Sequence, residues 1–197
     1  MAHKTLFLDM DRTLLNTNEF VQAFWRAVEK YYRINHEHAI AEMPKYYHDM
    51  GELRYHDLYL QLSELFGLDP DEVIATIRPD LATQDFLYAD VKPILALQKH
   101  DFELRIITFG EQWFQQCKLS FLPALDHLPR DIILESKGAF LARTYPQAEG
   151  WMIDDKRNPH LPPNVQEVYL DRTSEDPFTK KDGIIIINSL KHFQEAI

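Results

Sequence analysis

The 197-residue sequence has little of several features that would mark a specialised class of protein. Its single cysteine, Cys117, excludes an internal disulfide and a cysteine-based metal site. Basic residues are fewer than acidic ones, and the net charge of −10 disfavours a nucleic-acid or anionic-membrane surface. No run approaches the ~20 apolar residues that are needed to cross a bilayer. We therefore expect no nucleic-acid partner and no membrane partner.

The first ten residues, MAHKTLFLDM, lack the apolar stretch and the small-residue cleavage site of a secretory signal peptide. Together with the lone cysteine, this predicts a reducing, cytoplasmic location. Hydrophobic residues make up 45% of the chain, which is ordinary for a folded domain and argues against disorder.

Short apolar runs at both ends of the chain indicate a buried parallel sheet. The first covers about Lys4 to Met10, and the others are LRIITF (104–109), IIL (132–134), WMI (151–153), VYL (168–170) and IIII (184–187). Brief runs rich in β-branched residues, alternating with helical segments, are typical of parallel strands covered on both faces. The sequence thus predicts an α/β, Rossmann-like core, with Arg172 to Gly183 as its long loop.

Residues 17–88 have a different pattern, because their apolar residues recur at three- and four-residue intervals without a strand signal. We predict an all-helical domain at 17–88, inserted into a core made of residues 1–16 and 89–197. Its aromatic residues, such as Phe20 and Phe24, are interpreted as the core of the helical bundle. A wall on which a nucleobase stacks is the alternative.

Two pairs of carboxylates follow two of the predicted strands. Asp9 and Asp11 end the first strand, and Asp154 and Asp155 follow WMI. Open α/β sheets bind ligands just outside the carboxyl ends of their strands. Carboxylates that meet at one edge repel each other unless a cation separates them, and Mg²⁺ prefers such oxygen ligands. The two pairs together predict a metal site, although either pair alone is also typical of a solvated turn.

Two further residues are candidates for binding a phosphate group. Thr108 ends the strand LRIIT, where its hydroxyl and the following backbone N–H groups could bind phosphate oxygens. Lys137 lies near the start of a helical stretch, where a positive charge opposes the helix dipole. That position is explained if the lysine binds an anion. Taken singly, an ordinary strand-end threonine and an exposed loop lysine are the simpler interpretations.

These segments, taken in order, resemble the haloacid dehalogenase-like (HAD) superfamily. DMDRT, the threonine of RIITFG, the lysine of ESKGAF and the acidic pair of WMIDD are similar to its motifs I to IV. The inserted helical domain resembles its type C1 cap. The sequence departs from the usual pattern at three places: Arg12 replaces a glycine, Gly138 replaces a common proline, and Asn158 stands where many members carry an aspartate.

The resemblance implies a Mg²⁺-dependent phosphatase that hydrolyses a small phosphorylated metabolite through an aspartyl-phosphate. Asp9 would be the nucleophile, and Asp11 would be the general acid and then the general base. The ion would be held by Asp9, by the main-chain carbonyl of Asp11 and by an acid of the second pair. Asp155 is the expected direct ligand, with Asp154 as a neighbour or a water-mediated ligand.

The resemblance also implies that Thr108 and Lys137 bind the transferred phosphoryl group and offset its charge. Two alternatives stay open on the same scaffold: a phosphomutase, and a non-catalytic binding or regulatory protein. The expected partner is a small phosphorylated substrate, and neither its identity nor the oligomeric state follows from the sequence.

Overall fold

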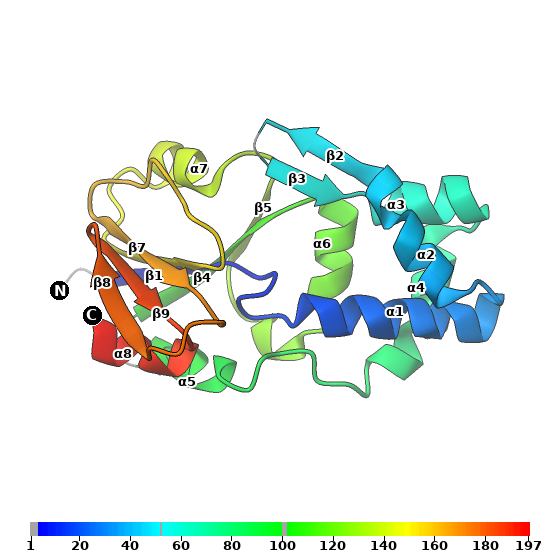
Figure 1. Ribbon diagram of the computed structural model, residues 1–197, viewed down its shortest axis with the longest axis horizontal. Helices are drawn as coiled ribbons and strands as arrows, with labels where there is room; N and C mark the ends of the chain where they lie inside the picture. The colour runs from blue at the N-terminus through cyan, green and yellow to red at the C-terminus, as the bar shows by residue number, and fades with distance from the viewer. Residues whose placement is uncertain (1–3, 52, 100–101) are drawn as a thin grey trace. The chain divides into compact units, whose positions relative to one another are not determined.

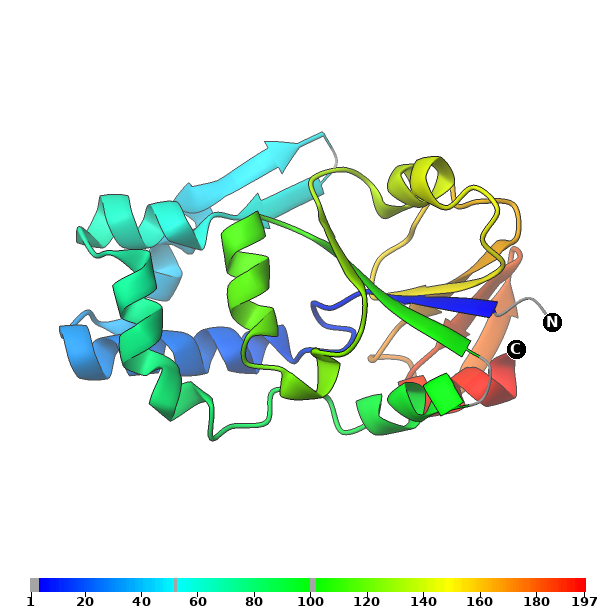
Figure 2. The same ribbon diagram turned by 180° about the vertical axis from the view of Figure 1, so that it is seen from behind.

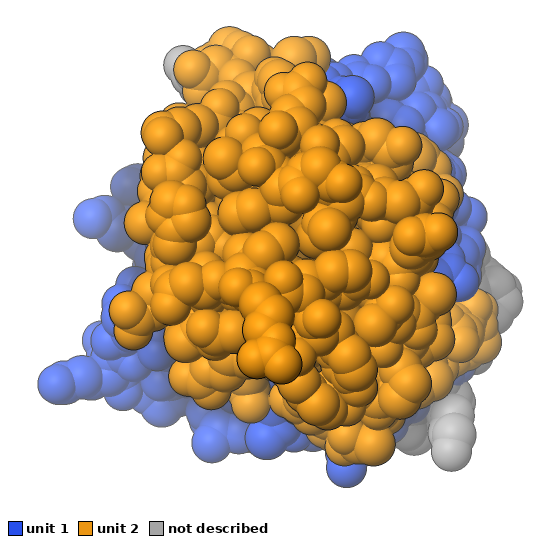
Figure 3. All heavy atoms as spheres, turned by 90° about the vertical axis from the view of Figure 1, so that its right-hand side faces the viewer, with its two compact units in different colours: residues 1–15, 87–108, 128–197 blue, residues 16–86, 109–127 orange. Residues whose placement is uncertain are grey.

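The computed structural model describes residues 4–51, 53–99 and 102–197. The chain forms two compact units (Figure 3). Unit 1 comprises Met1–Leu15, Leu87–Thr108 and Leu128–Ile197, and unit 2 comprises Asn16–Phe86 and Phe109–His127. The predicted domain ranges also contain residues 1–3, 52 and 100–101, which lie outside the described residues. Among the described residues, no helix is both long enough and apolar enough to span a bilayer.

Unit 1 is built on a seven-stranded sheet with the order β5-β4-β1-β6-β7-β9-β8 (Figure 1). β1 pairs parallel with β4 and β6, β6 with β7, and β7 with β9, whereas β8 is antiparallel to β9. The strands are β1 Lys4–Leu8, β4 Phe102–Phe109, β5 Arg130–Ile133, β6 Gly150–Asp154, β7 Val165–Leu170, β8 Phe178–Lys181 and β9 Ile184–Ile187. The predicted α/β, Rossmann-like core is confirmed.

Helices cover both faces of this sheet. Figures 1 and 2 show α7 on one face and α5 and α8 on the other. The helices are α5 Val91–Ala96, α7 Lys137–Thr144 and α8 Phe193–Ala196, with 3₁₀ turns at Leu97–Lys99 and Leu190–His192. Since successive side chains of a strand point to opposite faces, this double cover buries Leu6, Phe7 and Leu8 of β1 alike.

The stretch from Arg172 to Gly183 was predicted to be a loop, and this is wrong for β8. All four residues of β8 are exposed at the edge of the sheet, so they lack the buried alternation that marks a strand. β8 forms because Asp182 and Gly183 make a two-residue turn into β9, with φ of 51° and 79°. Asp-Gly is a strong signal for such a hairpin turn, and it was present in the sequence.

Unit 2 is largely helical and contains a hairpin. The helices are α1 Thr17–Tyr32, α2 His36–Glu42, α3 Leu58–Leu60, α4 Pro70–Leu81 and α6 Gln112–Leu119, with 3₁₀ turns at Met43–Tyr46 and Pro123–Leu125 and a π-helical turn at Gln61–Leu65. The prediction of an all-helical insertion is wrong where β2 (Tyr47–Met50) pairs antiparallel with β3 (Leu53–His56). In β2 and β3 only His56 is buried, so the pattern of alternation was too weak to show the strands.

Residues 109–127, which the predicted boundaries place in the core, cluster with unit 2. The reason is a shared aromatic core. The ring of Phe20 lies 6.5 Å from that of Phe114, 5.9 Å from that of Phe121 and 5.2 Å from that of Phe86. All four rings are buried, which supports the interpretation of the helical aromatic residues as core.

Candidate active site

The pairing of β1 with β6 brings two of the predicted site residues, Asp9 and Asp154, together. Leu8 of β1 lies opposite Ile153 of β6 in the parallel register, so Asp9 and Asp154 follow side by side. The N–H of Asp9 donates to the carbonyl of Ile153 at 2.9 Å, which extends this pairing by one residue. Both carboxylates are buried, with 3% and 1% of their residue surface exposed. The carboxyl ends of these strands therefore place two buried acids at one edge of the sheet.

Asp11 lies in a tight turn that follows Asp9. The N–H groups of Leu14 and Leu15 both donate to the carbonyl of Met10, and the N–H of Arg12 donates to the carbonyl of Leu15 at 2.9 Å. This turn requires a φ of 62° at Arg12, in the left-handed region that favours glycine. The geometry explains why glycine is the usual residue at this position in the superfamily that the sequence resembles.

Lys137 lies at the first position of α7 and is buried against both acids. Its Nζ is 2.5 Å from Asp9 Oδ1 and 2.6 Å from Asp154 Oδ2. The next residue, Gly138, packs closely against the loop after β6. A Cβ at that position would lie 1.8 Å from the carbonyl oxygen of Pro159. The glycine therefore lets the loop after β6 lie directly against the first turn of α7.

The charges of this centre shift the pKa values of its members. Burial is the main cause that raises the pKa of Asp9 to about 8; Lys137 lowers this pKa, and the charges of Asp154, Asp11 and Asp155 contribute to raising it. Burial lowers the pKa of Lys137, but Asp9 and Asp154 more than reverse this and raise it above its usual value. Burial and the charge of Asp154 raise the pKa of Asp155 to about 6. The raised pKa values of Asp9 and Asp155 show that burial and repulsion between the carboxylates disfavour their negative charges.

A divalent cation would relieve this repulsion between the carboxylates. Asp9, Asp154 and Asp155 each offer a carboxylate oxygen, and these oxygens lie within 4.8 Å of one another. An all-oxygen set of donors suits Mg²⁺. Asp154 already accepts hydrogen bonds from the N–H of Lys156 and the Nδ2 of Asn158, both at 2.9 Å. The ranking of Asp155 as the direct ligand, and the use of the Asp11 carbonyl, stay predictions.

Thr108 lies at the end of β4, which pairs with β1, and is completely buried. Its Oγ1 has no hydrogen-bond partner in the part of the chain that the structure describes. A buried hydroxyl without a partner costs about 1–3 kcal/mol, so the position calls for a ligand atom. Thr13 shares both properties. A phosphate oxygen is the kind of acceptor that either hydroxyl could bind.

Comparison of the sequence with protein-family models and with curated proteins finds no match. Comparison with solved structures does find matches. A protein from Burkholderia xenovorans, designated a haloacid dehalogenase-like hydrolase, has a TM-score of 0.67 and 18% identity, over 98% of this chain and 96% of that one. The HAD phosphatase from Thermococcus onnurineus has a TM-score of 0.60 and 16% identity, over 98% and 96%.

A third structure, from Bacillus subtilis, is designated a HAD-hydrolase bound to magnesium and has a TM-score of 0.56 and 14% identity, over 99% and 98% of the two chains. The chain has the HAD-like fold. The likeness extends over nearly the whole chain, so the predicted resemblance in fold is confirmed. What the HAD-like fold does in this chain depends on its own side chains.

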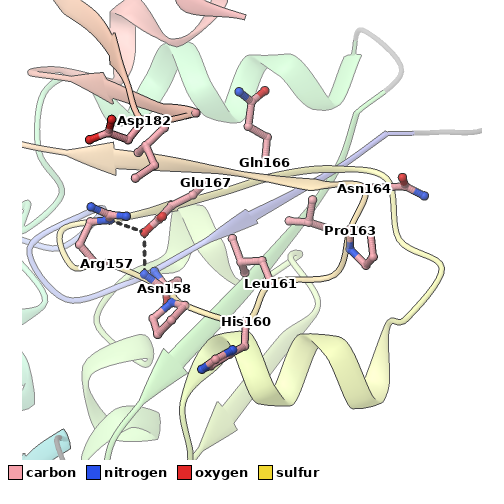
Figure 4. A pocket seen from close by; sticks show the side chains of 13 residues that line it. Arg157, Asn158, His160, Leu161, Pro163, Asn164, Gln166, Glu167 and Asp182 are labelled. Atoms are coloured by element: carbon pink, nitrogen blue, oxygen red, sulfur yellow. Dashed lines mark hydrogen bonds and ion pairs between the residues drawn. The ribbon is translucent and has the colours of Figure 1, made fainter.

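Asn158 and Glu167 support the site and were not predicted as site residues. Figure 4 shows Glu167 of β7 accepting hydrogen bonds from Arg157 Nε at 2.9 Å and from the N–H of Asn158 at 2.6 Å. Asn158 in turn donates to Asp154 Oδ2. Its place in the motif was a signal, whereas nothing in the sequence marks Glu167.

Asn158 and Glu167 also line the surface hollow of about 610 Å³ in Figure 4, which lies between the loop after β6 and the β8–β9 turn. None of the predicted catalytic, phosphate-binding or metal-binding residues lines this hollow. The hollow is therefore lined by other residues than the carboxylate centre, and Asn158 connects the two because it lines the hollow and donates to Asp154.

Proposed function

We propose that this protein is a Mg²⁺-dependent phosphatase of the HAD-like superfamily that hydrolyses a small phosphorylated metabolite. The observation that carries the proposal is the buried contact of Lys137 with both Asp9 and Asp154. Burying three charged groups is costly and gives little net stability compared with apolar packing. A chain that retains them at the carboxyl ends of its strands, beside Asp155, has a reason other than folding.

Asp9, Asp154 and Asp155 are the residues that would hold the Mg²⁺. The bound ion would supply positive charge that keeps Asp9 ionised and that offsets the charge of a phosphate ester. The magnesium in the Bacillus subtilis structure of the same fold supports this choice of ion.

The first step is the transfer of the phosphoryl group to the enzyme. An oxygen of Asp9 attacks phosphorus, and the bond between phosphorus and the ester oxygen breaks, which leaves an aspartyl-phosphate. Asp11 gives its proton to the departing oxygen. Lys137 Nζ and Thr108 Oγ1 bind oxygens of the phosphoryl group, which satisfies the otherwise unpartnered threonine hydroxyl.

The second step returns the enzyme to its starting state. Asp11, now ionised, takes a proton from a water molecule, and that water attacks the phosphorus of the aspartyl-phosphate. The bond between phosphorus and the Asp9 oxygen breaks, and inorganic phosphate leaves. Asp11 has its proton again, so the two steps balance.

A dehalogenase is the main competing activity, because a 2-haloacid dehalogenase from Pseudomonas syringae has the same fold. Asp11 favours the phosphatase. A departing halide is stable as an anion, whereas a departing alkoxide needs a proton, which an acid two residues after the nucleophile supplies. A phosphomutase uses the same chemistry and differs only in the acceptor of the phosphoryl group.

The test measures phosphate release from a panel of phosphate monoesters, including p-nitrophenyl phosphate, with Mg²⁺ and with a chelator. We expect turnover that requires Mg²⁺ and that falls at least about 10³-fold in Asp9→Asn. The matched control is Asp131→Asn, which changes a carboxylate of β5 bound to Arg105 and Tyr145. Turnover that survives Asp9→Asn, or chloride release from a 2-chloro acid without phosphate release, would overturn the proposal.

A further inference from the structure

Arg172 follows β7 at the edge of the sheet where the carboxylates lie, and its guanidinium holds the turn that contains Asp11. Nη2 donates to the carbonyl of Thr13 at 2.8 Å, and Nε donates to the carbonyl of Arg12 at 3.2 Å. The same guanidinium forms two hydrogen bonds to Asp90, at 2.8 and 3.1 Å. All three nitrogens are therefore used, and they join the turn to a second segment of unit 1.

Asp90 is fixed in turn by its own partners. Its Oδ2 accepts hydrogen bonds from Ser189 Oγ at 2.7 Å and from the N–H of Leu190 at 2.9 Å. Burial raises the pKa of Asp90, but the hydrogen bonds from Arg172 and Ser189 lower it overall, so the carboxylate is ionised near neutral pH. The guanidinium also lies 3.8 Å from the ring centroid of Tyr88. The hydrogen bonds of the guanidinium and its contact with the Tyr88 ring together fix the position of the arginine.

The two segments that Arg172 joins are those through which the chain first leaves unit 1 and first re-enters it. Unit 1 is interrupted after Leu15 and resumes at Leu87, and these two residues form an antiparallel bridge. The N–H of Tyr88 donates to the carbonyl of Leu14 at 3.0 Å. Arg172 therefore holds the base of both connections.

We propose that Arg172 is a positioning residue for the reaction, which sets the turn of residues 11–13 so that Asp11 reaches the departing oxygen. This inference rests on the proposed function. The left-handed conformation of Arg12 costs about 1–2 kcal/mol relative to glycine, so the turn needs support from outside. Hydrogen bonds to the carbonyls of Arg12 and Thr13 supply that support. A general acid works only within hydrogen-bond reach of its proton acceptor.

The variant Arg172→Lys separates positioning from charge pairing. Its ammonium can still pair with Asp90, but one nitrogen on a flexible stem cannot replace three fixed donors. We expect kcat to fall about 10- to 100-fold with KM unchanged, because a small displacement of a catalytic group has effects of this size. Arg143→Lys is the matched control, since Arg143 is an exposed arginine paired with Glu135, and we expect its kcat to stay at the wild-type value.

Amide hydrogen exchange gives a readout that does not depend on turnover. The N–H groups of Leu14 and Leu15 are bonded to Met10 within the turn, so they should exchange faster in Arg172→Lys, whereas those of β1 should not change. If Arg172→Lys does not fold, Asp90→Asn should show the same changes to a smaller extent, because it frees the guanidinium without removing it.

The outcomes distinguish this inference from the proposed function. Wild-type turnover together with wild-type kcat and exchange in the folded variants overturns the role of Arg172 and leaves the phosphatase standing. Absence of turnover in the wild type overturns the phosphatase, and the exchange of Leu14 and Leu15 then decides by itself whether Arg172 holds the turn.

Discussion

The buried polar groups of the two units differ in kind. In unit 1, buried carboxylates of Asp9 and Asp154 surround the ammonium of Lys137. In unit 2, His56 Nε2 is 2.7 Å from Gln61 Oε1, and Gln61 Nε2 donates to the carbonyl of Ala39 at 2.7 Å. The first group carries charge into the interior, whereas the second is a neutral chain that ends on the backbone.

The neutral chain in unit 2 has the features of a structural device. Because the amide of Gln61 donates to Ala39, its oxygen faces His56, and the proton of the neutral ring lies on Nε2. His56 Nδ1 is buried without a partner within the described residues, and burial lowers the pKa of His56 to about 4. A core tolerates such neutral, mostly satisfied groups at little cost.

By contrast, the charged centre of unit 1 is costly to bury. Its carboxylates repel one another, and the partners that would satisfy Thr108 and Thr13 are missing from the described chain. Centres of this kind, with pKa values moved by burial and by charge, are typical of functional sites. The buried polar groups of unit 1 therefore indicate a functional site, whereas those of unit 2 indicate a structural core.

The substitution with the largest expected effect on this difference between the units is Lys137→Met. Removing the ammonium leaves Asp9 and Asp154 without their shared cation, and we expect the free energy of unfolding to fall by about 3–5 kcal/mol without metal. Mg²⁺ should recover much of the loss, because it replaces the missing charge. Urea denaturation with and without Mg²⁺ measures both effects.

The control for this experiment lies on the same helix. Arg143→Met removes an exposed partner of Glu135, and it should leave the free energy of unfolding close to the wild-type value, with no Mg²⁺ dependence beyond the wild type. Equal losses in the two variants would mean that the buried centre is an ordinary ion pair.

The pH dependence of stability tests the neutral chain in unit 2. The folded pKa of His56 is about 4, below its unfolded value of 6.5, so the unfolded state binds the extra proton between these values. Stability from this group is full above pH 6.5 and is lost as the pH falls toward 4, by up to about 3 kcal/mol. Urea denaturation at several pH values should show a smaller loss in His56→Phe. The exposed His38→Gln should retain the wild-type slope, and a wild-type slope in His56→Phe would contradict the assignment.

The smallest expected effect compares two arginines, one in each unit. Arg12 and Arg33 both have a φ of 62°, and Arg33 ends α1 as its C-cap. Glycine relieves the strain of this conformation, so Arg12→Gly and Arg33→Gly should each raise the free energy of unfolding by about 1 kcal/mol. Thermal denaturation measures both. A loss of stability in Arg12→Gly alone would show that the arginine side chain supports the turn of unit 1.

Local patterns were enough to predict the sheet and the ends of its strands. Leu6 to Leu8 are buried on both faces of the sheet, and Ile184 to Ile187 alternate between partly buried and buried, so both short apolar runs are marked by composition alone. Of the residues that the order of the sequence motifs singled out, the structure brings Asp9, Asp154, Asp155 and Lys137 together. The hairpins at β2–β3 and β8–β9 were missed, because exposed strands carry little hydrophobic periodicity.

The sequence by itself determined which residue types reach the carboxyl edge of the sheet, because strands and their ends are encoded by neighbouring residues. Only the tertiary structure decided which distant groups hold them. Arg172 and Asp90 lie 82 positions apart, and Lys137 and Asp9 lie 128 apart. Residues so far apart leave no local pattern, since their contact depends on how the strands are ordered in the sheet. The same reason places α6 with unit 2, where Phe114 finds the aromatic core.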